Sequence, residues 1–142
     1  MRNINQIIVH CSATPPSMSV GAEDIRRWHL EKGWSDIGYG YVIKRNGEIE
    51  KGRDIARAGA HAKGYNRNSI GICLVGGVDE NGKPDDNYRI IQYQSLKTLI
   101  HILEITFPIE SVLGHRDLPN VNKPCPCFDV QSWLEYENER TF

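Results

Sequence analysis

The sequence lacks any long run of apolar residues. Its first segment, MRNINQIIVHCS, holds only three consecutive apolar residues, Ile7 to Val9. A run this short is not the apolar core of a secretory signal peptide, and nothing elsewhere in the chain is long enough to cross a bilayer. We therefore expect a protein that is made in the cytoplasm without a signal peptide and that has no membrane partner.

The sequence also lacks an excess of charge of either sign. The 17 basic and 18 acidic residues leave a net charge of −1, which gives no electrostatic reason to expect nucleic acid as a partner. Repeats, low-complexity tracts and linkers are missing as well. The 142 residues are 39% hydrophobic, which is ordinary for a globular protein, so residues 1–142 are expected to form one domain and a monomer.

Cysteine is scarce and unusually spaced. The four cysteines are Cys11, Cys73, Cys125 and Cys127, and a single proline separates the last two. This spacing is too tight for the Cys-x-x-Cys pairs of zinc ribbons and redox sites. Because cytosolic thiols stay reduced, free thiols or metal ligands are a better interpretation than a disulfide framework. If the segment binds a metal, its other ligands must come from elsewhere.

Hydrophobic patterning predicts an α/β single domain with a central mixed β-sheet flanked by about three helices. Strands are expected at residues 6–11, 69–75 and 111–113, with a hairpin over 39–51 that turns at Asn46-Gly47. Helices are expected at residues 22–32, 88–107 and 130–139. In the second helix, Ile91, Leu96, Leu99, Ile100, Leu103 and Phe107 should share the buried side. The intervening segment 53–68 is long for a loop in a compact domain, and such loops are often functional.

Three candidate metal ligands lie in or after predicted strands. His10 is in the first strand, His115 follows the short strand 111–113, and Cys125 lies ten residues later in a proline-rich loop. Two histidines and a thiolate suit zinc, and three protein ligands leave a fourth position open, as in catalytic sites. Water on such a zinc has a pKa near ~7. The plainer interpretation, buried histidines and a packed cysteine, fits the spacing alone at least as well.

Longer segments carry a resemblance to a known family. VHCSAT (9–14), IRRWHLEKGWSDIGYGYVIKRNG (25–47), GAHAKGYNRNSIGICLVGG (59–77) and HRD…KPCPCFD (115–129) resemble the zinc-dependent N-acetylmuramoyl-L-alanine amidases. This family includes peptidoglycan recognition proteins and amidase-type bacteriophage lysozymes, and the phage lysozymes are the more similar. The match runs in order across nearly the whole chain and is weakest over residues 78–113. It implies a mixed sheet with a zinc cleft on one face.

The resemblance also assigns site residues. It implies one zinc per chain held by His10, His115 and Cys125, because in the family pattern the ligand cysteine directly precedes a proline. Cys127 then takes the place of a small residue, and Cys11 should pack on the opposite face of its strand. Tyr39 and Lys123 match catalytic positions, with the tyrosine handling water and protons and the lysine stabilising charge on the carbonyl oxygen. Without the resemblance, Tyr39 would be interpreted as a core aromatic residue and Lys123 as a solvated loop lysine.

Substrate contacts are less sharply indicated. The resemblance suggests that His61 lines the cleft, with Trp34 and Asn66 as further candidates for the same wall, although a plain loop histidine is an equal interpretation. His29 and His101, within predicted helices, are interpreted as structural or surface residues. Many phage relatives have histidine where this chain has Gly40, so one cleft contact is expected to be missing.

Three functions remain in competition. The first is a zinc hydrolase that cuts the amide bond between N-acetylmuramic acid and the L-alanine of the stem peptide, in a phage or prophage endolysin that acts on the cell wall after release. The second is a non-catalytic peptidoglycan recognition module, which often lacks the ligand cysteine. The third, inhibition of a phage RNA polymerase, is disfavoured by the short segment before Gln6 and by the near-neutral charge.

Overall fold

Strand β1 (Gln6–Cys11) lies between β4 and the edge strand β5 in a five-stranded sheet of order β3-β2-β4-β1-β5. The structure, a computed structural model, describes residues 2–140. Strands β1, β2 (Tyr41–Ile43), β4 (Ser69–Leu74) and β5 (Ser111–Gly114) pair in parallel, and β3 (Ile49–Lys51) runs antiparallel to β2 at one edge. The predicted α/β fold with a mixed sheet is confirmed.

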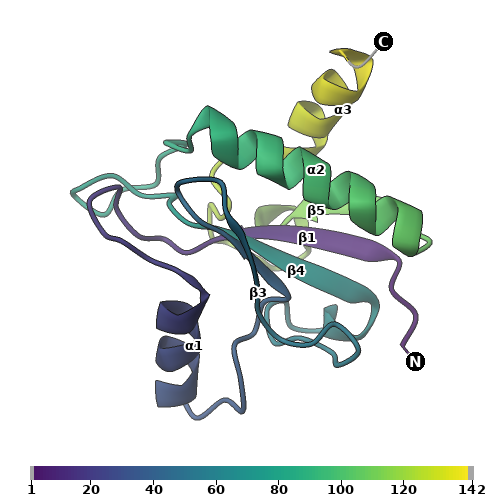
Figure 1. The fold of residues 1–142 in the computed structure, drawn as a ribbon, viewed down its shortest axis with the longest axis horizontal. Helices are drawn as coiled ribbons and strands as arrows, with labels where there is room; N and C mark the ends of the chain where they lie inside the picture. The colour runs from purple at the N-terminus through teal and green to yellow at the C-terminus, as the bar shows by residue number, and fades with distance from the viewer. Residues whose placement is uncertain (1, 141–142) are drawn as a thin grey trace.

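Within the described part of the chain, three helices flank the sheet: α1 (Ala22–Glu31), α2 (Ile90–Thr106) and α3 (Val130–Arg140). Figure 1 shows α2 crossing over the sheet, with α3 projecting beyond it and α1 at the far end of the molecule. Two short 3₁₀ turns, η1 (Asn66–Asn68) and η2 (His115–Asp117), complete the described elements. The helix count and approximate ranges agree with the prediction, whereas the hairpin strands are shorter than residues 39–51 suggested. Within residues 2–140, no helix is long and apolar enough to cross a membrane.

The alternation of side chains along β1 separates the two faces of the sheet. Ile7, Val9 and Cys11 join the core cluster that also contains the buried residues of α2, while Ile8 joins a smaller cluster with Ala62 and Leu118. His10 shares the parity of Ile8 and therefore faces away from α2. The site described below consequently lies on the sheet face opposite α2, where α1 and the loop 52–65 are found.

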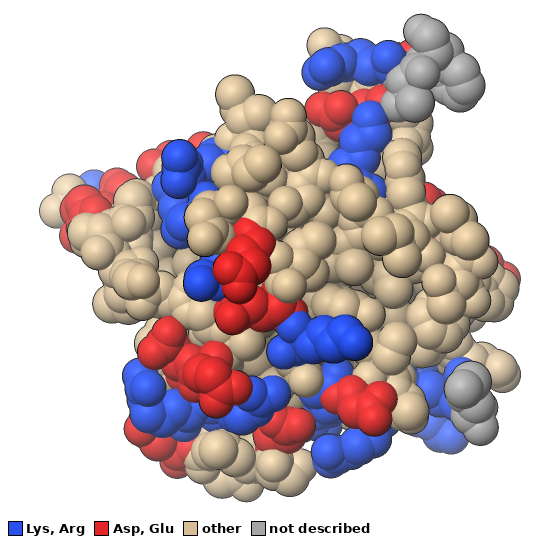
Figure 2. Space-filling model, in the orientation of Figure 1, with Lys and Arg blue, Asp and Glu red and all other residues tan. Residues whose placement is uncertain are grey.

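The outer side of α2 departs from the predicted pattern. Ile91 was expected to point inward, but it is 41% exposed, and Ile102 and Ile105 are also exposed. The prediction for Ile91 is wrong because the inward positions at this end of the helix are taken by Gln92 and Leu96. The amide of Gln92 is buried and donates to the carbonyl of Val75, 2.9 Å away. Figure 2 shows α2 largely uncharged, with acidic and basic side chains mixed over the region of α1.

Candidate metal centre and catalytic cleft

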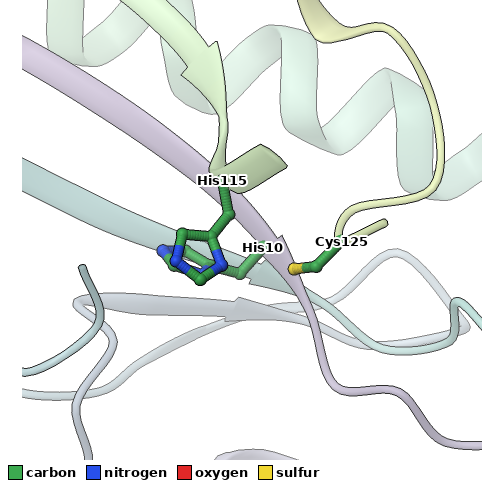
Figure 3. Close-up of side chains that lie close together, drawn as sticks. All are labelled: His10, His115 and Cys125. Carbon is green, nitrogen blue, oxygen red and sulfur yellow. The ribbon is translucent and has the colours of Figure 1, made fainter. Parts of the chain in front are cut away.

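His10, His115 and Cys125 come together at one end of β1, although they are distant in the sequence. Their ligand atoms all lie within 4.8 Å of one another, and the two imidazole rings are 4.5 Å apart between centroids (Figure 3). Tetrahedral zinc with ordinary bond lengths would place such atoms about 3.3–3.8 Å apart. Small side-chain movements would close that gap. Among residues 2–140, this group does not include Cys127.

The backbone explains why Cys125 reaches the end of β1. The carbonyl of Cys125 accepts a hydrogen bond from the backbone N–H of Arg116, 2.8 Å away, immediately after His115. Behind it, the buried hydroxyl of Tyr88 donates to the carbonyl of Pro126 at 2.7 Å. These two contacts tie the proline-rich loop to η2 on one side and to the core on the other, so two ligands are held together by one backbone bridge.

The electrostatics of the group suit a cation. Burial holds the pKa of His10 well below its ordinary value, and burial and the nearby Lys123 also lower the pKa of His115. Both rings are therefore neutral near pH 7, the form in which histidine binds metal. A hydrogen bond with the Cys11 thiol and burial raise the pKa of Cys125. A cation would reverse that shift and favour the thiolate, so the donor set of two imidazoles and one thiol fits zinc.

Tyr39 lies beside the ligands. Its ring centroid is 5.1 Å from that of His10, and burial holds the pKa of its hydroxyl well above the ordinary value. Gly38, just before it, approaches the loop so closely that a Cβ there would lie 2.1 Å from the carbonyl oxygen of Ala60. Glycine at this position therefore lets the loop and the tyrosine segment lie against each other.

A cleft of about 680 Å³ opens over these residues. Its lining includes the three ligand candidates and Tyr39, together with a set of basic and aromatic side chains: His29, Lys32, Trp34, His61, Lys63 and Lys123. The exposed Lys123 thus lies in the cleft, as the resemblance suggested. Three lysines in one cleft suit a substrate that carries carboxylates.

The three residues expected to contact substrate, Trp34, Asn66 and His61, differ in how far their side chains are free to do so. Trp34 is 37% exposed and packs against the His29 ring at 4.5 Å between centroids, so it presents an aromatic surface. The Asn66 side chain also lines the cleft, but its Oδ1 accepts from the backbone N–H groups of His61 and Ala62 at 2.9 and 3.0 Å. Asn66 therefore shapes the loop. His61 has both ring nitrogens engaged within the protein, as described below.

His29 combines a structural role with a place in the cleft. Its Nδ1 accepts the backbone N–H of Gly38 at 2.9 Å, and its ring is 5.6 Å from that of Tyr39. Its place in a predicted helix indicated a structural or surface residue, and nothing in the sequence placed it in the cleft. His29 lies four residues after Ile25, so both face the buried side of α1. This spacing is the sequence feature that could have indicated its buried position.

Gly40 lies directly after Tyr39 and just before β2. A Cβ at this position would meet the side chains of Ile55 and Ile70 at 3.3 Å, so a larger residue would point toward them. The expectation that a cleft contact is missing here stays a prediction.

The other two cysteines near the site serve the surrounding structure. Cys11 packs in the core with α2, as predicted, and its backbone N–H donates to Sγ of Cys125. Cys127 adopts a left-handed backbone conformation with φ 73°, and its thiol donates to the carbonyl of Gly77 at 3.2 Å. The two cysteines of the Cys-Pro-Cys segment thus have different surroundings, which agrees with the assignment of only Cys125 as a ligand candidate.

Comparison with known proteins gives the family. A family model described as N-acetylmuramoyl-L-alanine amidase matches residues 1–128. The chain is 50% identical over 129 residues to the endolysins of Enterobacteria phage T3 and Escherichia phage T7, which covers 91% of this chain and 84% of each relative. The chain therefore belongs to the N-acetylmuramoyl-L-alanine amidase family, and it is an amidase.

Solved structures agree with this result. The amidase LysC from Clostridium intestinale URNW has a TM-score of 0.83 at 26% identity, with 97% of this chain and 87% of that chain covered. Drosophila PGRP-LB has a TM-score of 0.74 at 29% identity, with 89% and 76% covered. Both proteins share the fold, so the resemblance seen in the sequence is confirmed. The roles of individual residues remain predictions.

Proposed function

We propose that this protein hydrolyses the amide bond between N-acetylmuramic acid and the L-alanine of the stem peptide, as a zinc-dependent amidase. The observation that carries the proposal is the convergence of His10, His115 and Cys125 in the same cleft as Tyr39 and Lys123. Family membership supplies the reaction class, and the cleft supplies groups suited to it.

His10, His115 and Cys125 would hold one zinc ion. When bound by three protein ligands, zinc supplies a Lewis acid and a water that ionises near neutral pH. The protein contributes the geometry. β1 fixes His10, η2 fixes His115, and the bridge from Arg116 to the carbonyl of Cys125 fixes the thiol relative to both.

Tyr39 and Lys123 act on the reacting groups. Attack of water on the amide carbon places negative charge on the carbonyl oxygen, and the leaving amine needs a proton. The Lys123 ammonium, in the cleft beside His115, can stabilise that oxygen. The Tyr39 hydroxyl, next to His10, can orient the attacking water and pass a proton to the amine.

Muramyl peptide is the substrate class that the cleft suits. Stem peptides carry carboxylates, which match the ammonium groups of Lys32, Lys63 and Lys123, and the exposed face of Trp34 offers an apolar surface for a sugar or peptide. The similarity to phage endolysins supports a lytic role for this chain as well, acting on the cell wall after release from the cytoplasm.

Removal and return of the metal test the proposal. The zinc content of the purified protein is measured, zinc is removed with a chelator, and release of soluble peptides from purified peptidoglycan is followed before removal, after it, and after zinc is restored. We expect hydrolysis to disappear and return with about one zinc per chain. In parallel, sedimentation with peptidoglycan measures binding. Binding without hydrolysis by the zinc-loaded protein would instead support a non-catalytic recognition module.

A further inference from the structure

The imidazole of His61 lies between a metal-ligand candidate and the first residue of β4. Its Nδ1 is 2.8 Å from Nε2 of His10, and its Nε2 is 3.1 Å from the hydroxyl oxygen of Ser69. The His10 and His61 rings meet edge to face, at 87° and 4.9 Å between centroids. His10 and Ser69 are almost completely buried, so these contacts are shielded from water.

The hydrogen bonds of Ser69 determine which atoms donate and which accept in these contacts. The Ser69 hydroxyl is 2.7 Å from the carbonyl oxygen of Tyr65, which can only accept a hydrogen bond. The single hydroxyl hydrogen of Ser69 is therefore used there, and its oxygen must accept from Nε2–H of His61. A neutral imidazole carries one N–H, so Nδ1 of His61 is left as an acceptor.

The same reasoning extends to the metal ligand. Since Nδ1 of His61 is an acceptor, Nε2 of His10 must carry the hydrogen and donate it. The other ring nitrogen of His10, Nδ1, then holds the free lone pair. A metal ligand needs such a lone pair, and metal-bound histidines usually donate their second ring nitrogen to a fixed acceptor.

We infer that His61 is a positioning residue that fixes the tautomer and the ring orientation of His10, so that His10 presents Nδ1 to the metal. The inference rests on the proposed metal centre and assigns His61 a role different from that of a substrate contact. We call this series of hydrogen bonds, from Tyr65 through Ser69 and His61 to His10, the relay. The hydrogen bond from Ser69 to the carbonyl of Tyr65 fixes which nitrogen of His61 donates, and His61 in turn fixes which nitrogen of His10 donates.

The surroundings of His61 hold the ring in place. Gly71 on β4 lies against it, and a Cβ at that position would come within 2.6–2.8 Å of the imidazole atoms, so only glycine leaves room. The backbone N–H of His61 donates to Oδ1 of Asn66. Arg2 donates to the carbonyl of Ser69 at 2.8 Å, which anchors the other end of the relay. The position of the imidazole is therefore fixed from several sides.

Zinc affinity of matched variants tests the role. His61→Asn keeps an acceptor, because its Oδ1 can take the place of Nδ1, whereas His61→Leu removes it. Zinc dissociation constants are measured by chelator competition on each protein, with circular dichroism as the check on folding. We expect about a 10- to 100-fold weaker zinc affinity for His61→Leu, substantially recovered in His61→Asn. Wild-type affinity in a folded His61→Leu protein would overturn the inference, whereas failure of the wild type to bind zinc would refute the metal centre itself.

A spectroscopic test needs no variant and so does not depend on folding of His61→Leu. Long-range ¹H–¹⁵N correlation spectra of the zinc-loaded wild-type protein report which ring nitrogen of each histidine carries hydrogen and which carries metal. We expect hydrogen on Nε2 and zinc on Nδ1 for His10, and hydrogen on Nε2 for His61. Zinc on Nε2 of His10, or hydrogen on Nδ1 of His61, would overturn the inference.

Discussion

The backbone N–H of Cys11 donates a hydrogen bond to Sγ of Cys125 at 3.1 Å, across 114 positions of the sequence. Strand β1 therefore serves the site twice: it supplies the His10 side chain, and the next residue supplies a backbone donor to the candidate thiolate ligand. A hydrogen bond to sulfur favours its charged form and limits its direction. This relationship makes Cys125 and Cys127 unequal, although only a proline separates them.

Serine substitutions should reveal that difference. Cys125→Ser replaces the proposed thiolate with a poor zinc ligand, so we expect loss of most bound zinc and of most amidase activity. Cys127→Ser should keep both, because the hydroxyl can still donate to the carbonyl of Gly77. Metal analysis and peptide release measured on both proteins check this. Zinc loss confined to Cys127→Ser would show that the ligand was assigned to the wrong cysteine.

Removal of the Tyr39 hydroxyl should separate catalysis from metal binding. In Tyr39→Phe, the ring still packs beside His10, so the fold and the zinc content should not change. The rate constant kcat should fall by roughly 10²-fold or more, the usual scale for a lost proton-transfer group. Tyr136→Phe, which removes an exposed hydroxyl from α3, is the matched control. Turnover close to that of the wild type in Tyr39→Phe would remove this residue from the mechanism.

Lys123→Ala tests charge stabilisation at the carbonyl oxygen. Lys123 is exposed in the cleft, so its truncation should not affect folding, while kcat should fall by roughly 10²-fold. Lys83→Ala, at an exposed loop lysine, removes the same charge elsewhere. Equal activity of the two variants in steady-state assays would show that Lys123 is only a solvated loop residue.

The hydrogen bond from Gly38 to Nδ1 of His29 predicts a pH dependence of stability. Burial lowers the pKa of His29 from its ordinary value of 6.5, so the unfolded chain takes up a proton more readily than the folded one. This contribution to stability is complete above pH 6.5 and is lost as the pH falls through the lowered pKa. The slope is no more than about 1.4 kcal/mol per pH unit.

Urea denaturation between pH 7.5 and 5 measures this effect against two variants. His29→Asn can keep the acceptor for Gly38 without titrating, so its stability should fall less than that of the wild type as the pH decreases. His29→Leu leaves the buried N–H of Gly38 without its acceptor and should cost about 1–3 kcal/mol at pH 7.5. Parallel pH profiles for the wild type and His29→Asn would contradict the assigned role of His29.

The sequence predicted the sheet and the helices well because their patterns are local. The buried run of β1 and the glycine after α1, Gly33 with φ +90°, are examples. It could not predict that Gln92 would replace Ile91 on the inner side of α2, because that depends on a carbonyl supplied by Val75. The ligand candidates were selected by resemblance, whereas the relay through His61 and Ser69 depends on strand pairing and loop geometry, which no spacing reveals.

Identification of the bond that the protein cuts tests the central claim most directly. Peptidoglycan is digested with zinc-quantified protein, and the soluble products are identified by mass spectrometry and by labelling of new amino groups. We expect free stem peptides with L-alanine at a new amino terminus, and glycan strands without new reducing ends. New reducing ends, or amino groups on residues other than L-alanine, would contradict the assignment of the muramoyl–alanine amide as the substrate bond.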